Sequence, residues 1–174
     1  MTETVRLLGL DPGLRATGWG VIDVTGNRLV HVANGTVQSS KTLSLAERLV
    51  EIEAGLVRVL AEFSPISAAV ETAFMARDAQ AALKLGQARA VALLVPAREG
   101  LEVAEYAPNK IKKAVTGAGH ADKQQIKMMV ETLLPRCQPS SEHAADALAT
   151  AICHAHYRSA VSYVERAEKQ ASQA

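Results

Sequence analysis

The sequence predicts an α/β fold in which a mixed sheet of five strands is flanked by helices. Three apolar segments at the N-terminus, separated by short turns, have the length of strands and predict an antiparallel meander. Farther along the chain, helical and strand patterns alternate, which is typical of parallel strands joined by crossover helices. No internal repeat and no linker interrupts the 174 residues, a length that suits one domain.

The predicted meander consists of strands over residues 5–11, 17–24 and 28–38. A Pro-Gly pair breaks the chain after the first strand, and residues 25–27 (Thr-Gly-Asn) form a good hairpin turn between the other two. The first strand therefore ends on a carboxylate, Asp11.

The middle of the chain predicts a helix, a strand, a second helix and a second strand. Apolar residues recur at steps of three and four from Leu45 to Phe63, with charged residues between them, so this segment predicts an amphipathic helix across a sheet face. Residues 66–71 are a short apolar run that again ends on a carboxylate, and their position after a helix predicts a strand parallel to the first. A long Ala-rich helix over 78–98 and a short strand over 101–106 follow.

The C-terminal part changes character. Residues 107–123 are rich first in lysine and then in glycine, so we expect a short basic helix followed by a mobile loop. A further helix is expected from about residue 122 to 134, with Asp122 suited to be its N-cap. The final helix is expected to begin after a cap at Ser140 or Ser141.

The composition is that of an ordinary soluble globular protein, with 48% apolar and 21% charged residues. No run reaches the length of a membrane span, and the first residues lack the basic start of a secretory signal. Cys137 and Cys153 are far apart and predict neither a disulfide framework nor a zinc site, which fits a reducing cytoplasm. We expect one domain over residues 1–158 and a polar, frayed tail over 159–174.

Acidic residues end two of the predicted strands and begin the last helix. Asp11 closes the first strand and Glu71 the fourth, at the edge of the sheet where α/β proteins bind ligands. His143 and Asp146 are three positions apart and share one face of the last helix. Oxygen ligands without cysteine suit Mg²⁺ or Mn²⁺. Two such ions about 4 Å apart can activate a water and stabilise the departing oxygen in phosphodiester cleavage.

Each of these residues also has a simpler interpretation. Asp11 can make a side-chain turn with the following backbone amides, and Glu71 can be an ordinary charge at a strand end. Acidic residues in the first turn of the last helix can simply favour its dipole. The remaining histidines are interpreted as surface or local polar residues: His31, His120, His154 and His156.

Positive charge gathers in one region, although the net charge of the chain is only +1. This balance argues against a protein that coats nucleic acid through bulk electrostatics. The region contains five lysines: Lys110, Lys112, Lys113, Lys123 and Lys127. Such a run is usually a solvated helix face, but beside an acidic metal site it would hold phosphates and offset the repulsion of DNA.

Six short segments, taken in order, resemble the RuvC-type Holliday junction resolvases. They are residues 9–13 (GLDPG), 17–20 (TGWG), 71–75 (ETAFM), 81–89 (AALKLGQAR), 110–113 (KIKK) and 144–149 (AADALA). The resemblance extends from about residue 5 to about residue 157. Several motifs in one order are far more specific than any one of them.

The resemblance implies a ribonuclease H-like fold and a Mg²⁺-dependent endonuclease that resolves four-way DNA junctions by paired, symmetric nicks in two opposite strands during recombination and repair. It carries the catalytic and metal-binding roles to Asp11, Glu71, His143 and Asp146, with two Mg²⁺ or Mn²⁺ ions per site. At the position of His143 some members have Asp and others His, so a negative charge is replaced by an imidazole. The resemblance also implies a homodimer. The Ala- and Gly-rich helix over 78–98 is the candidate interface, although its small residues equally suit packing on the sheet.

The DNA-binding roles follow from the same resemblance. The basic junction-contacting residues of the family match Lys112 and Lys123, and Lys110 and Lys113 belong to the same basic segment. The family's aromatic residue beside the junction centre matches Phe74. From the sequence alone, Phe74 is either a loop residue that stacks on an unpaired base or a residue folded back into the core. Branch-migration proteins of the RuvA and RuvB type are candidate partners.

Two other functions compete with this one. Asp-x-Gly followed by Thr-Gly also resembles the phosphate loop of sugar kinases and actin-like ATPases, but those proteins need two such domains and 174 residues provide one. A protein that binds junctions without cutting them would gain by losing Asp11, Glu71 and Asp146, because carboxylates repel phosphates. Their presence favours a nuclease.

Overall fold

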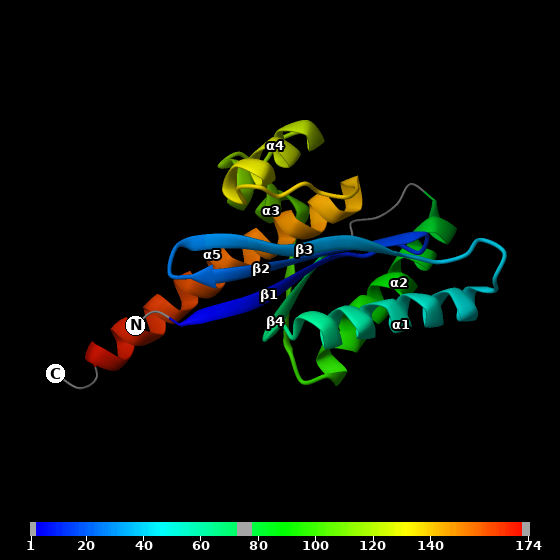
Figure 1. Cartoon of the computed structure of the whole chain (residues 1–174), viewed down its shortest axis with the longest axis horizontal. Coiled ribbons are helices and arrows are strands. Elements are labelled where there is room, and N and C mark those ends of the chain that lie inside the picture. Colours follow the sequence, from blue (N-terminus) through cyan, green and yellow to red (C-terminus); the bar gives the residue numbers. More distant parts are fainter. Residues whose placement is uncertain (1–2, 73–77, 172–174) are drawn as a thin grey trace.

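The computed structural model describes residues 3–72 and 78–171, with side chains up to residue 158. Within these residues a five-stranded mixed sheet has the order β3-β2-β1-β4-β5 (Figure 1). Its strands are β1 (Thr4–Asp11), β2 (Ala16–Thr25), β3 (Arg28–Gln38), β4 (Ser67–Glu71) and β5 (Glu102–Tyr106). The first three strands are antiparallel, whereas β4 pairs in parallel with both β1 and β5. The predicted meander followed by parallel strands is confirmed.

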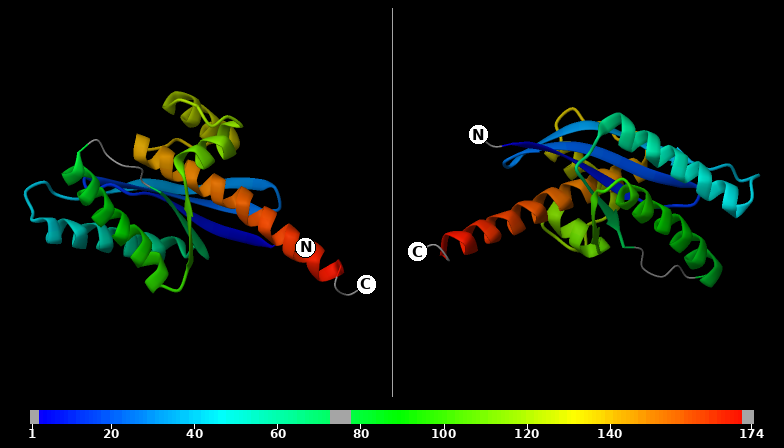
Figure 2. Two further views of the ribbon diagram at one scale, coloured as in Figure 1. Left: turned by 180° about the vertical axis from the view of Figure 1, so that it is seen from behind. Right: turned by 90° about the horizontal axis from the view of Figure 1, so that it is seen from below.

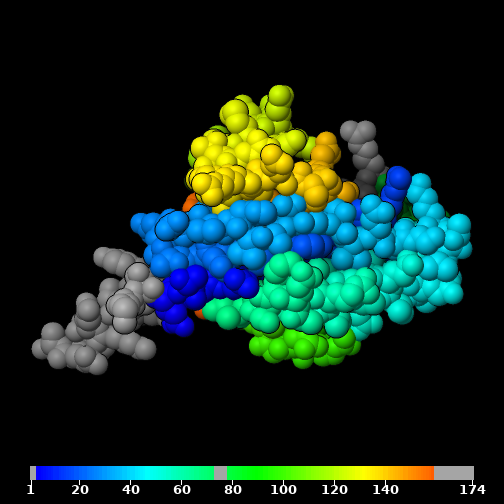
Figure 3. Space-filling view, viewed as in Figure 1, coloured from blue at the N-terminus to red at the C-terminus, as the bar shows by residue number. Residues whose placement is uncertain are grey.

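Helices cover both faces of this sheet (Figures 1 and 2). They are α1 (Leu45–Phe63), α2 (Ala79–Arg98), α3 (Pro108–Thr116), α4 (Lys123–Leu133) and α5 (Glu142–Ala171). α1 and α2 lie on one face, and α5 crosses the other with α3 and α4 packed beside it. Figure 3 shows the blue strands of the meander between the yellow α4 region and the cyan-green α1.

Alternation along β1 divides the core into two layers. Leu7 is buried with the residues of α3, α4 and α5, whereas Leu8 is buried with those of α1 and α2. Successive side chains of a strand point to opposite faces of its sheet, so both faces of this central strand are apolar. The central position of β1 follows from this pattern, and it carries Asp11 to the edge of a rigid sheet.

The helix starts are explained by side-chain caps. Asp122 accepts a hydrogen bond from the backbone of Gln125 at 2.8 Å, so it is the N-cap of α4 as predicted. Ser141 accepts from the backbone of Ala144 at 3.0 Å, which makes Ser141, and not Ser140, the residue that caps α5. α5 then continues to Ala171 instead of ending near residue 158. Its extension contains neither glycine nor proline, so the backbone has no local reason to leave the helix.

Two glycines allow α5 to lie directly on the sheet. A Cβ atom on Gly9 would lie 2.0 Å from the carbonyl oxygen of Ala147, and one on Gly18 would lie 2.0 Å from that of His143. Ala144, on the first turn of α5, is fully buried. Small residues on both elements therefore bring the start of α5 against β1 and β2, which sets His143 beside the end of β1.

A buried polar network joins α5 to β4 and β5 through His154, which is only 3% exposed. The interpretation of His154 as a surface or local polar residue was therefore wrong. Its Nε2 lies 2.7 Å from Ser67 Oγ and its Nδ1 lies 2.9 Å from the hydroxyl of Tyr106. Ser67 donates its single proton to the carbonyl of Glu102 at 3.1 Å, so it accepts from Nε2–H of the histidine. Tyr106 then donates to Nδ1, and the neutral imidazole satisfies the whole network.

Acid is expected to destabilise the fold through His154. Burial lowers the pKa of its imidazole to about 4, below its ordinary value of 6.5. As the pH falls from about 6.5 to about 4, the unfolded chain binds a proton that the folded chain does not, so the free energy of unfolding falls by about 3 kcal/mol. Urea unfolding of the wild type and of His154→Gln at pH 7, 5.5 and 4 measures this effect. The variant should lose less stability in acid than the wild type, and equal losses would contradict the prediction.

Candidate functional site

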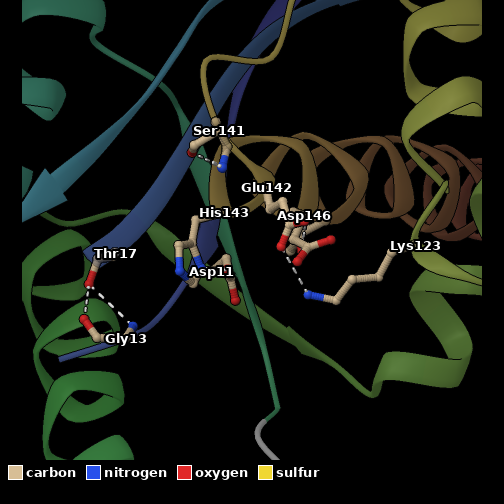
Figure 4. A network of polar contacts seen from close by, with 10 residues as sticks. Asp11, Gly13, Thr17, Lys123, Ser141, Glu142, His143 and Asp146 are labelled. Carbon is tan, nitrogen blue, oxygen red and sulfur yellow. Dashed lines mark hydrogen bonds and ion pairs between the residues drawn. The ribbon is translucent and has the colours of Figure 1, made fainter. Parts of the chain in front are cut away.

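The acidic residues predicted from the sequence lie at the same edge of the sheet. Asp11 is the last residue of β1 and Glu71 is the last residue of β4, and the parallel pairing of these strands places their ends side by side. His143 and Asp146 lie in the first turns of α5. Figure 4 shows Asp11, His143 and Asp146 gathered where β1 meets α5.

A hydrogen bond connects Asp11 to His143. Nδ1 of His143 donates to Oδ2 of Asp11 at a distance of 2.7 Å. The carboxylate of Asp11 is only 15% exposed, whereas the imidazole of His143 is 49% exposed. Burial raises the pKa of Asp11, and the contact with His143 opposes that rise. The histidine thus lies against a largely buried carboxylate and stabilises its charge.

Burial and the charge of Asp11 raise the pKa of the two other carboxylates, Glu71 and Asp146. Burial, followed by the charges of Asp11 and Asp146, raises the pKa of Glu71 to about 7. Burial and the charge of Asp11 raise the pKa of Asp146 to about 6. Half-buried acids that repel one another are stabilised by a cation, which replaces the lost hydration and offsets the repulsion.

The donor chemistry of this edge fits a hard divalent cation. Carboxylate oxygens are the ligands of Mg²⁺ and Mn²⁺, and no thiolate competes at this position. Within the ranges that the structure describes, no group of three or more His, Cys, Asp or Glu side chains lies close enough together to hold a metal ion. The structure thus brings Asp11 and His143 into hydrogen-bond contact. Glu71 and Asp146 lie on the neighbouring elements β4 and α5.

Lysines face the acidic edge from two helices. Lys123, at the start of α4, lies with its Nζ 3.6 Å from the carboxylate of Glu142, and its charge lowers the pKa of Asp11, Glu71 and Asp146 (Figure 4). The charge of Lys112, on α3, also lowers the pKa of Glu71. A pocket of ≈ 290 Å³ between α4 and α5 is lined by Lys123, Gln124, Lys127, Glu142, Ala145 and Asp146.

The other predicted DNA-binding residues have different surroundings. Nζ of Lys110 lies 3.8 Å from the centre of the Tyr157 ring and 5.1 Å from that of Tyr106, a cation–π arrangement. Lys113 is exposed on α3. Phe74 lies outside the described residues. The sequence grouped Lys110 with Lys112 and Lys113 because they are close together in the chain, whereas the turn of the helix directs Lys110 toward the tyrosines.

The turn that follows Asp11 is held by a residue to which the sequence assigned no separate role. Thr17 is fully buried, and its hydroxyl donates to the carbonyl of Gly13 at 2.8 Å and accepts from the amide of Gly13 at 3.3 Å (Figure 4). Arg48 of α1 donates to the carbonyl of Leu14 at 3.2 Å. The sequence signal for Thr17 was its Thr-Gly pair, whose contact with the Pro-Gly turn is visible only in the folded chain.

Known proteins resemble this chain over most of its length. The family model described as crossover junction endodeoxyribonuclease RuvC matches residues 7–154. A protein of that name from Parvibaculum lavamentivorans is 69% identical over 160 residues, which covers 92% of this chain and 91% of that protein. One from Afipia carboxidovorans is 61% identical over 158 residues, which covers 91% and 92%.

Solved structures resemble the fold as well. The structure of T. thermophilus RuvC in complex with a Holliday junction substrate superimposes with a TM-score of 0.83 at 34% identity, covering 89% of this chain and 95% of that one. The yeast mitochondrial Holliday junction resolvase Ydc2 superimposes with a TM-score of 0.69 at 11% identity, covering 95% and 86%. The second likeness concerns the fold alone.

Proposed function

This chain belongs to the RuvC family of crossover junction endodeoxyribonucleases and resolves Holliday junctions, and we propose that Asp11, Glu71, His143 and Asp146 form its active site. Its ribonuclease H-like fold, expected from the sequence, is confirmed by the likeness to T. thermophilus RuvC. The observation that supports the active site is the meeting of two strand ends, each closed by a carboxylate, with the first turns of α5.

Membership of this nuclease family implies a divalent metal cofactor. We propose Mg²⁺, which Mn²⁺ can replace, with two ions held by the carboxylates of Asp11, Glu71 and Asp146 together with His143. When bound, such ions supply an activated water and stabilisation of the departing oxygen in phosphodiester cleavage. The raised pKa values of Glu71 and Asp146 support this assignment, because both carboxylates gain from a nearby cation.

The side chains around the acids have separate tasks in this proposal. His143 donates to one oxygen of Asp11 and supplies an imidazole where a fourth carboxylate would add negative charge. Lys112 and Lys123 hold backbone phosphates of the junction beside the acidic edge and reduce its repulsion of DNA. Lys113 is an exposed contact for a more distant phosphate.

Lys110 and Phe74 are two further proposed DNA contacts. Lys110 keeps its cation–π contact with Tyr157. It contacts the DNA only at the edge of the surface formed by Lys112, Lys113 and Lys123. Phe74, which follows β4 by three positions in the sequence, is proposed to stack on a base at the junction centre.

We propose that the protein is a homodimer that pairs through α2. Leu83 and Leu94 of α2 are 64% and 58% exposed, and their spacing of eleven positions, about three helical turns, places them on one face. A two-fold dimer presents two sites to two equivalent strands of a junction.

Sedimentation equilibrium tests the proposed dimer. It should give a wild-type dimer and a Leu94→Glu monomer, whereas Met128→Glu, at a residue of equal exposure on α4, should remain dimeric.

The substrate suggests further partners, and the cysteines suggest a location. We propose docking of branch-migration proteins of the RuvA and RuvB type, because such proteins act on the same four-way junction. We also propose a cytoplasmic location, supported by two free and buried cysteines, Cys137 and Cys153. Among the described helices, none is both long and apolar enough to cross a membrane.

Incubation with Mg²⁺ and labelled four-way, three-way and linear duplex DNA tests the proposed activity. We expect paired nicks at symmetric positions of the four-way substrate alone, and no nicks after EDTA has removed the metal. Equal cutting of linear duplex would indicate a general nuclease instead. Junction binding without any cleavage would indicate a passive binder.

A further inference from the structure

Arg89 of α2 contacts the end of β4, where the proposed catalytic Glu71 lies. Its Nε donates to the backbone carbonyl oxygen of Glu71 at 3.3 Å. Its Nη2 pairs with the carboxylate of Glu105 on β5. The side chain of Arg89 is only 22% exposed. One side chain thus bridges α2 to two strands at the edge of the sheet.

The carbonyl that Arg89 contacts belongs to the peptide unit between Glu71 and Thr72. The amide of this same unit donates to the carbonyl of Tyr106 on β5 at 2.9 Å. On the other side of β4, β1 ends at Asp11 and is followed by Pro12, which has no N–H to donate to the sheet. Arg89 therefore supplies a donor at a position where the neighbouring strand offers none.

We propose that Arg89 is a positioning residue for Glu71, an inference that rests on the proposed role of Glu71 in the active site. With both its carbonyl and its amide hydrogen-bonded, the peptide unit after Glu71 has a fixed plane. This restrains rotation about the Cα–C bond of Glu71, and with it the direction of the Cα–Cβ bond. Arg89 thereby orients the carboxylate toward Asp11 and Asp146, although it does not touch the reacting atoms.

The geometry requires an arginine. Its planar fork presents Nε to the carbonyl and Nη2 to the Glu105 carboxylate at the same time. A lysine retains the positive charge beside Glu105, but its single Nζ cannot occupy both positions. Arg89→Lys therefore removes the contact with the Glu71 carbonyl while preserving the charge.

We expect Arg89→Lys to lower the single-turnover rate of four-way junction cleavage about 10–100-fold at saturating enzyme. Junction binding in EDTA should be unchanged, because Arg89 is half-buried and lies behind the strand end. A readout that is independent of activity is the ¹³C resonance of the Glu71 carbonyl, which should shift in the variant as its hydrogen bond is lost.

The matched control is Arg98→Lys. Arg98 lies on the same helix and forms an ion pair with Glu53 of α1 at 2.7 Å, so the same substitution disturbs an equivalent charge pair away from the strand end. The control should retain the wild-type cleavage rate and the wild-type Glu71 resonance. A loss of equal size in Arg98→Lys would overturn the proposal, because it would show a general effect on α2.

A wild-type cleavage rate for Arg89→Lys, beside an inactive Glu71→Gln, would overturn the positioning role alone. Cleavage by Glu71→Gln would instead remove Glu71 from the active site, and the carbonyl resonance would still show whether Arg89 holds the strand end. If circular dichroism shows that Arg89→Lys does not fold, Glu105→Gln provides the test. It releases the guanidinium from its anchor, so it should slow cleavage several-fold, and a wild-type rate would overturn the proposal.

Discussion

Replacing Asp146 with Asn is expected to abolish cleavage while leaving four-way junction binding intact. The amide has the size of the carboxylate but no charge, so we expect the cleavage rate to fall by about 10³-fold or more. Burial and the charge of Asp11 raise the pKa of Asp146 to about 6, so the neutral side chain is well tolerated in the fold. Single-turnover nicking in Mg²⁺ and fluorescence anisotropy of the junction in EDTA measure the two properties.

Glu142→Gln is the matched control for this prediction. It removes one negative charge from the same helix, but Glu142 is 81% exposed and pairs with Lys123 instead of facing Asp11. Its cleavage rate should stay near that of the wild type. Both variants should bind the junction at least as tightly as the wild type, because each removes a charge that repels phosphates. Mg²⁺-dependent nicking retained by Asp146→Asn would remove this residue from the catalytic set.

Replacing Gly18 with Ala is expected to destabilise the protein by about 3 kcal/mol. The added Cβ would lie 2.0 Å from the carbonyl oxygen of His143, which is backbone and cannot turn aside. α5 must therefore move away from the sheet at the point where Gly18 pairs with Asp11 across β1 and β2. The same movement separates His143 from Asp11, so cleavage should fall more steeply than stability alone explains. Urea unfolding and single-turnover cleavage well below the melting temperature measure both effects.

Gly119→Ala is the control for the glycine substitution. Only the carbonyl oxygen of Asn109, at 4.0 Å, lies near the Cβ that this change adds. Its free energy of unfolding should remain close to that of the wild type. A wild-type stability for Gly18→Ala would show that α5 can shift without cost, and would contradict the close approach as the feature that places His143.

Much of the fold is encoded in local patterns of the sequence. Short apolar segments separated by turns predicted the meander, and the periodic segment from Leu45 to Phe63 predicted α1. The carboxylates at the ends of β1 and β4 were predicted to share an edge because parallel strands end together. These predictions succeeded because each depends on residues that are close in sequence or on the general geometry of sheets.

Other features were decided by tertiary structure. The burial of His154 depends on partners in β4 and β5, and the contact of Arg89 with Glu71 depends on how α2 packs under the strand end. The position of the Lys110 ammonium group likewise depends on Tyr157, a residue of α5. Each of these contacts joins residues that are distant in the chain, so no local pattern predicts it.

Residue types and their order were enough to identify the acidic residues at the two strand ends. They were also enough to recognise the family resemblance that gave these residues catalytic roles. Only the folded chain showed that Asp11 is hydrogen-bonded to His143 and that glycines bring α5 close enough for that contact. The physical reason is that residue type and spacing specify a side chain's chemistry and its element. The distance between two elements is set instead by the volumes of the residues packed between them.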